Sequence, residues 1–282
     1  MRQKPVAPLP EPPGFFYSPT QSDILLRCCF FTAVWCTVRV LLSATLFRRD
    51  PESQRRAVQL TGAINSALIF PSAVWVVLRD PAVAPSMRTL ISFAPGPLDL
   101  VNLHSPTVSL LATMAAGEFA MQMIHVRAWF LKKDDALMAA HHVLSLVFWP
   151  ISQMAQRGGF FIAFYMLYEA STPFLQTLTL PWVKARPTLH ALDGTLFTIC
   201  FLLFRIVTIP HFVYGLYVAL PYFRSAPTFT DCPQWYSESA LFHFCEFWLM
   251  PLPLLINSYW SRQVVLGYLN ALRKLRSGKK QA

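Results

Sequence analysis

Seven apolar segments, each roughly 20 residues long, follow one another along the chain and are separated by short polar stretches. A helix of about this length crosses the roughly 30 Å of hydrocarbon in a bilayer. Hydrophobic positions do not alternate with period two, so helices rather than barrel strands are expected to make the crossings. The pattern predicts an all-α polytopic membrane protein of about seven transmembrane helices, with spans at 24–47, 57–78, 106–126, 136–154, 159–180, 192–220 and 238–260.

Two of these predicted spans contain a proline that should disturb the helix. Pro210 lies inside the long sixth segment, which we expect to be kinked or tilted there. Pro173 lies inside the fifth and should end or bend its helix, which would open backbone groups near Glu169.

The two ends of the chain differ from this apolar middle. Residues 1–22 hold six prolines and almost no aliphatic run, which predicts a flexible tail. Residues 263–282 are rich in lysine and arginine and are expected to form a basic tail. We therefore expect one transmembrane domain over 24–262 with a polar extension on either side.

Composition and charge agree with a membrane protein and indicate its orientation. Hydrophobic residues make up 54% of the chain and charged residues only 13%, and the net charge is +10. Such an excess of cations normally lies in cytosolic loops, so it does not indicate a nucleic-acid partner. With seven spans, 15 lysines and arginines fall on the side of the C terminus and 6 on the side of the N terminus. The N terminus is thus expected in the lumen and the C terminus in the cytosol.

The six cysteines form no CxxC pair, and five of them lie in apolar segments. We expect buried small hydrophobic side chains rather than a disulfide framework or a zinc site. Histidines are not spaced as HxxxH or HxxHH, as the two irons of membrane desaturases require, so no metal is predicted. No glycine-rich phosphate loop or serine nucleophile elbow occurs either.

Polar side chains within the predicted spans are the candidates for function, because ionisable groups in a bilayer are costly. His141 and His142 are adjacent, and Glu169 follows in the next span. Adjacent helical residues point about 100° apart, so one imidazole is expected to face a reacting atom, and the other to bond a neighbouring helix or orient its partner. The remaining candidates, expected to bind substrate, are Glu118, Gln122, His125, Ser145, Thr172, Arg205, His211, His243 and Glu246.

An imidazole suits acyl transfer, because it is nucleophilic near neutral pH and can also carry a proton. Glu169 would then orient the imidazole and stabilise its cationic form. The alternative is structural, since buried polar groups can simply bridge helices by hydrogen bonds. We favour that alternative for His125, His211 and His243 taken singly, and Arg205 would serve only to neutralise Glu169 or Glu246.

Three stretches resemble the TLC-domain family, which includes the ceramide synthases, several lipid-homeostasis proteins and an endoplasmic reticulum (ER) protein lost in a neuronal ceroid lipofuscinosis. They are Ala140-His-His-Val-Leu-Ser145, Tyr168-Glu-Ala-Ser-Thr-Pro-Phe174 and Leu255-Ile-Asn-Ser-Tyr-Trp260. The resemblance implies catalytic roles for His141, His142 and Glu169, with an acyl thioester and an amine as substrates. Two further positions that are acidic in ceramide synthases are not acidic in this chain. Thr172 stands at one of them. Gln122 stands near the other, and Glu118 lies one turn away from it.

The resemblance implies a protein of ER lipid metabolism with membrane lipids as partners. It would be an acyltransferase with acyl-CoA as co-substrate and no bound cofactor, or a lipid sensor using the same cavity. A second hypothesis, from another class, is an ER-to-Golgi cargo receptor. Lys279 and Lys280 resemble a di-lysine retrieval signal that coat machinery reads, which would suit either function. The sequence leaves the oligomeric state open, a homo-oligomer included.

Overall fold

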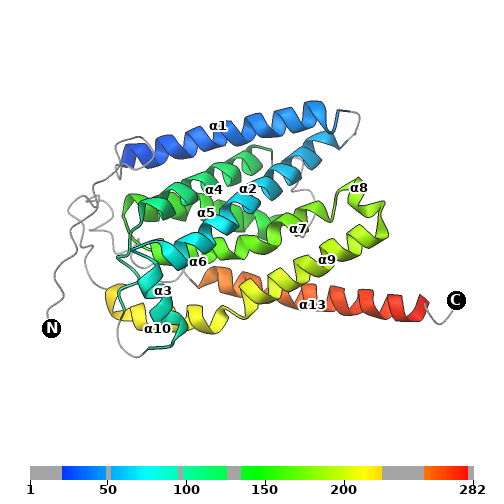
Figure 1. Cartoon of the computed structure of the whole chain (residues 1–282). Helices are drawn as coiled ribbons and strands as arrows, with labels where there is room; N and C mark the ends of the chain where they lie inside the picture. Colours follow the sequence, from blue (N-terminus) through cyan, green and yellow to red (C-terminus); the bar gives the residue numbers. More distant parts are fainter. Residues whose placement is uncertain (1–20, 49–51, 95–97, 126–134, 224–250, 279–282) are drawn as a thin grey trace.

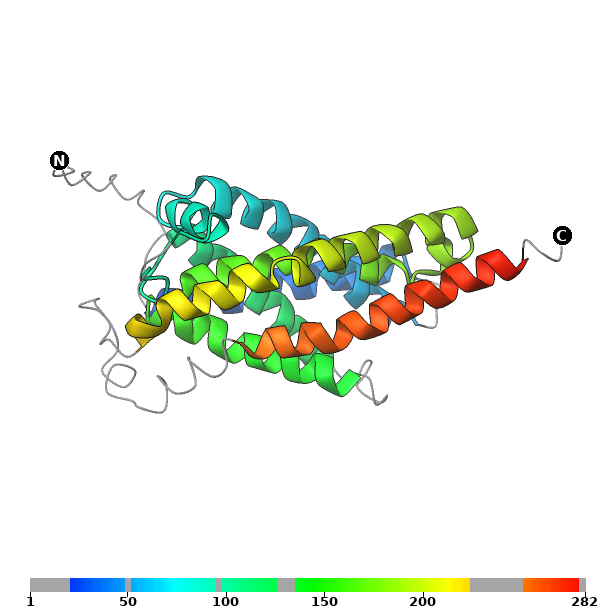
Figure 2. The same cartoon turned by 90° about the horizontal axis from the view of Figure 1, so that it is seen from below.

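The computed structural model describes residues 21–48, 52–94, 98–125, 135–223 and 251–278 (Figure 1). Regular structure within these ranges is entirely helical, which confirms the all-α prediction. The long helices lie lengthwise beside one another in an elongated bundle (Figures 1 and 2). The longer unbroken helices are α1 (Gln21–Thr45), α2 (Ser53–Arg79), α4 (Pro106–Ile124), α5 (Asp135–Met154) and α13 (Leu252–Gly278), and two short ones are α3 (Ala84–Ile91) and α8 (Pro181–Lys184).

Four helical segments of the described chain are long and apolar enough to cross a membrane, which makes the protein polytopic. They are Asp23–Thr45, Ser53–Arg79, Pro106–Ile124 and Pro187–Tyr222. The predicted fourth span corresponds to α5, which carries the histidine pair and is not among these four segments. The predicted count of seven thus stays a prediction, although every predicted span overlaps a helix.

The predicted fifth span is a helix with an irregular middle. α6 (Gly159–Met166) passes into a 3₁₀ turn, η2 (Leu167–Ser171), and α7 (Thr172–Thr177) follows. Pro173 stands in the first turn of α7, where its missing N–H is tolerated. In a continuous α-helix its ring would clash with the carbonyl of Glu169, four residues earlier. This confirms the disturbance expected near Glu169.

The predicted sixth span is also interrupted. α9 (Pro187–Phe201) changes to a π-helical turn, η3 (Leu202–Ile206), and α10 (Ile209–Phe223) begins one residue before Pro210. The break therefore lies on the N-terminal side of the proline, as its clash with the preceding turn requires.

The predicted last span, 238–260, overlaps α13 only from Leu252 onward, and residues 224–250 lie outside the described chain. α13 also continues through residue 262, where a separate tail was expected to begin, and ends at Gly278. A fall in hydropathy marked that predicted boundary, but lysine, arginine and leucine are good helix formers, so the helix continues into polar sequence.

α1 packs along α4 and α2 at one side of the bundle (Figure 1). Gly117 of α4 permits this close approach, because a Cβ at that position would lie 2.6 Å from the Cβ of Phe31. The opposite side of α1 has no described neighbour, and Cys29 is exposed there while Cys28 and Cys36 are half-buried. The expectation of buried cysteines is therefore wrong for the four described ones, Cys200 included, because their helices turn a face outward.

Candidate functional site

One cavity of about 360 Å³ lies inside the bundle, between α2, α4, α5, η2 with α7, α9 with η3, and α13. This volume falls in the range of small-molecule sites in proteins. Polar and aromatic side chains both line the cavity, so it offers hydrogen bonds as well as apolar contact. Its lining includes Gly62, Ser66, Glu118, Phe119, Gln122, His141, His142, Glu169, Thr172, Gln176, Arg205, Trp260 and Gln263.

Both histidines of the pair line this cavity. His142 is buried and stacks on the ring of Phe119, with centroids 4.9 Å apart, while His141 meets Trp260 edge-on at 5.9 Å. Both imidazoles border a cavity that reaches from α4 to α13, so which of them faces a reacting atom stays a prediction. The two ring centroids are 5.6 Å apart, and no hydrogen bond to either ring is recorded within the described chain.

Two carboxylates also line the cavity, and each has a hydrogen-bond donor of its own. Glu118 accepts a hydrogen bond from the amide of Gln122, one turn later on α4. Glu169 accepts one from the hydroxyl of Ser66 on α2, at 2.6 Å. No hydrogen bond joins Glu169 to an imidazole in the part of the chain that the structure describes, so the triad-like arrangement expected from the sequence is not formed.

Arg205 lies in η3, is buried and binds neighbouring helices rather than a carboxylate. Its Nε and Nη2 donate to the carbonyl oxygen of Tyr168, at 3.3 and 3.0 Å, and its Nη1 donates to Oδ1 of Asn257 at 2.7 Å. The ion pair with Glu169 expected from the sequence is absent from the described side chains, and Glu246 lies outside them. Instead, the guanidinium joins η2 to α13 across the cavity.

Other sequence candidates do not reach the cavity. His125 caps the end of α4, and His211 on α10 packs against the ring of Phe93 at 4.7 Å. Ser145 is buried one turn beyond the histidine pair but does not line the cavity. His243, Glu246, Lys279 and Lys280 lie outside the described residues, so their roles stay predictions.

Several lining residues were missed from the sequence. Ser66 and Gly62 lie on α2, Gln176 on α7, and Trp260 and Gln263 on α13. The available signal was the run of polar residues in the second predicted span, Gln59, Asn65 and Ser66, which a search for ionisable groups passes over. Within the described ranges, no three histidine, cysteine, aspartate or glutamate side chains gather in a way that could hold a metal ion.

These features define a polytopic helical membrane protein with a cavity lined by two imidazoles and two carboxylates. The chain belongs to the TLC-domain family, since the sequence model of the TLC domain matches residues 55–266. The match covers α2 to the middle of α13 and leaves α1 outside, and it confirms the resemblance of the histidine and proline motifs. No curated protein and no solved structure matches the chain.

Proposed function

We propose that this TLC-domain protein transfers an acyl group from a thioester, of the acyl-CoA type, to a membrane lipid acceptor in the ER. The observation that carries the proposal is that two imidazoles, with no hydrogen bond to another described residue, line the same cavity as two carboxylates. A purely structural pair of buried histidines would normally be satisfied by hydrogen bonds to neighbouring helices. Here the pair faces space instead.

The chemistry needs two steps. A neutral imidazole nitrogen attacks the thioester carbonyl carbon, the C–S bond breaks, and the departing thiolate takes the proton from the other ring nitrogen. The acceptor's hydroxyl or amine then attacks the same carbonyl carbon, the bond to the imidazole breaks, and the acceptor's proton returns to the histidine. The ring centroids of His141 and His142 are 5.6 Å apart, close enough for one to act as nucleophile and the other as proton carrier.

The carboxylates suit the acceptor side of this reaction. Glu169 is held by Ser66 and Glu118 by Gln122, so each has a fixed position on the wall formed by α2, α4 and η2. A carboxylate there can accept the proton of the attacking hydroxyl or amine and pass it to the departing imidazole, so that the proton ends on the histidine. This assigns Glu169 a role toward the acceptor, in place of the imidazole-orienting role expected from the sequence.

The test combines a cellular and a direct measurement. Null cells are rescued at matched expression with the wild type, His141→Ala, His142→Ala or Glu169→Gln, and their lipids are profiled. His211→Ala is the matched control, because His211 is a half-buried helical histidine that does not reach the cavity. Purified protein is also incubated with acyl-CoA and analysed by mass spectrometry for an acyl group on the peptide that contains the histidine pair.

We expect the control to restore the lipid profile and the three cavity variants to fail while remaining folded. An acyl adduct should form on the wild type and be lost in the variant of the attacking histidine. Rescue of the lipid profile by all three variants would refute acyl transfer. Normal lipids in the null cells, together with a defect in cargo export that the variants repair, would favour the cargo-receptor hypothesis instead.

A further inference from the structure

α13 is longer than the membrane needs. Its 27 residues extend about 40 Å, whereas the hydrocarbon core is about 30 Å thick. Asn257 is hydrogen-bonded to Arg205. Arg205 lies midway along the segment from Pro187 to Phe223, so Asn257 lies near the middle of the length of the bundle. About ten residues after Asn257 the helix reaches the edge of the hydrocarbon, near Gly267. The part from Val265 to Gly278 is named the arm here, and its C-terminal end extends beyond the rest of the bundle (Figure 2).

The arm carries apolar and basic side chains together, and they are exposed. Val265, Tyr268 and Leu269 are spaced as neighbours on one helical face, and between 37% and 42% of each is exposed. Arg273 of the arm and Arg262, about one turn before the arm begins, fall on an adjacent face and are exposed as well. A helix with this distribution suits the boundary between acyl chains and charged headgroups.

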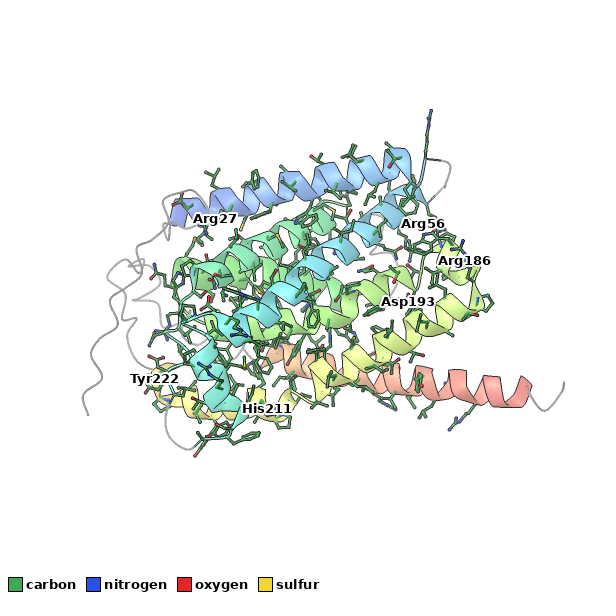
Figure 3. The ribbon with its side chains drawn as sticks, viewed as in Figure 1. Arg27, Arg56, Arg186, Asp193, His211 and Tyr222 are labelled. Atoms are coloured by element: carbon green, nitrogen blue, oxygen red, sulfur yellow. The ribbon has the colours of Figure 1, made fainter. Side chains whose placement is uncertain are left out.

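The end of the bundle from which the arm projects is basic. Arg56 and Arg186 both lie at this end, and the opposite end holds Tyr222 and Arg27 (Figure 3). Arg48, Lys184 and Arg186 are exposed there, and the sequence of the arm adds Arg273, Lys274 and Arg276. The cationic residues come from the α1–α2 connection, the α8 region and α13, so several elements contribute to the basic end.

We propose that the arm lies on the adjacent membrane leaflet and binds the headgroups of anionic phospholipids. Charge complementarity selects this partner, because lysine and arginine at a membrane surface attract acidic lipids. The arm is also continuous with a helix of the membrane domain, so its apolar face emerges at the headgroup level. The TLC-domain match ends at residue 266, so the arm is an addition to the shared domain, and the proposal does not depend on acyl transfer.

Gly267 gives the arm a place to bend toward the leaflet. A Cβ added there would meet nothing within 4 Å, so packing does not account for this glycine. Glycine weakens a helix interior relative to alanine.

Photocrosslinking in the full chain tests this proposal. p-Benzoylphenylalanine replaces Leu269, and the protein is reconstituted in phosphatidylcholine vesicles with or without phosphatidylserine. The charge variant is Arg273→Gln with Arg276→Gln. The matched control is Arg79→Gln with Arg88→Gln, which removes the same charge from exposed arginines at the other end of the bundle.

We expect phospholipid adducts at position 269 that are several-fold more abundant in vesicles with phosphatidylserine. The charge variant should lose this enhancement, and the control should keep it. Equal yields in neutral and anionic vesicles would overturn the proposal, as would an equal loss in the control variant. An adduct to a second copy of the chain would also overturn it, since it would make the arm a protein interface.

Discussion

At the residue scale, the polar wall of the cavity depends on a glycine. A Cβ at Gly62 would lie 3.1 Å from Oε1 of Glu118 and 3.3 Å from Nε2 of Gln122. Because Gly62 has no side chain, the Glu118–Gln122 pair can pack directly against α2 at this position. Ser66, one turn further along α2, holds Glu169 in the same way that Gln122 holds Glu118.

We predict that Gly62→Ala will impair lipid-dependent activity more than stability. The added methyl group forces the Glu118–Gln122 pair to shift by a few tenths of an ångström, which displaces a carboxylate at the acceptor wall. Lipid profiling of rescued null cells measures the activity, and thermal unfolding of purified protein measures the stability.

Gly194→Ala is the control for that variant, because a Cβ there makes only an ordinary contact, 3.7 Å from Leu178. It lies in the interior of α9, where alanine is the better helix former, so its activity should stay normal. Full activity of Gly62→Ala would show that the exact position of the Glu118–Gln122 pair is unimportant.

The sequence identified the charged and imidazole side chains of the cavity better than its small ones. His141, His142, Glu118, Glu169 and Arg205 stand out because ionisable groups are rare in apolar segments. Glycine and serine are common in transmembrane helices, so Gly62 and Ser66 carry no comparable signal. An ionisable side chain in an apolar segment need not belong to the cavity. His211 is such a side chain, and it packs against Phe93 outside the cavity.

At the scale of elements, Arg205 connects two helices that proline disturbs. The change to 3₁₀ geometry in η2 leaves the carbonyl of Tyr168 without its α-helical partner, and Arg205 donates two hydrogen bonds to it. The same guanidinium binds Asn257, so the break in one helix becomes the attachment point for α13.

We predict that Arg205→Lys will lower the free energy of unfolding by about 1–2 kcal/mol, although the charge is kept. A single ammonium group cannot reproduce the fork of the guanidinium, which contacts Tyr168 and Asn257 at once. Thermal unfolding in nanodiscs measures the loss. In an Asn257→Leu background the same substitution should cost less, and equal losses in both backgrounds would show that the two side chains are not coupled.

The packing of α1 on α4 gives a second prediction at this scale. Gly117→Ala should lower the free energy of unfolding by about 1–3 kcal/mol, because the new Cβ would lie 2.6–2.8 Å from side-chain and backbone atoms of Phe31 and Thr32. Backbone atoms cannot move aside without shifting α1. The unfolding transition is compared with that of Gly194→Ala, and an unchanged transition would mean that α1 moves freely on α4.

Hydropathy predicted where the helices lie better than where they break or end. Apolar stretches locate α2 and α4 to within a few residues, because burial in lipid depends on composition alone. Pro173 and Pro210 marked the two disturbed helices, since the effect of proline on a helix is local. The extension of α13 to Gly278 had no such signal, because a polar sequence can continue as a helix outside the membrane.

At the scale of the whole molecule, the two ends of the bundle differ in charge. One end has Arg56, Arg186 and the end of α13, and the other has α3, the end of α10 and Tyr222 (Figures 1 and 3). Described cations that the sequence analysis assigned to the side of the C terminus, such as Arg56 and Arg186, therefore lie together at one end of the bundle. The cavity histidines lie near the start of α5 and Gln176 near the end of α7, so the site lies in the half of the bundle toward the basic end.

This asymmetry leads to a prediction about topology. Cytosolic loops of membrane proteins carry the excess of lysine and arginine, so the basic end should face the cytosol and the cavity should open nearer to that side. A tag at the C terminus should then be accessible to antibody after selective permeabilisation of the plasma membrane, and a tag at the N terminus only after all membranes are permeabilised. A tag inserted between Phe47 and Ser53, next to exposed Arg48, should behave like the C-terminal one.

If both termini become accessible together, the number of crossings is even, and one of the seven predicted spans does not cross the membrane. If instead the N-terminal tag alone is accessible, the orientation is inverted, and an acyl thioester made in the cytosol would have to approach from the end that lies farther from the histidine pair.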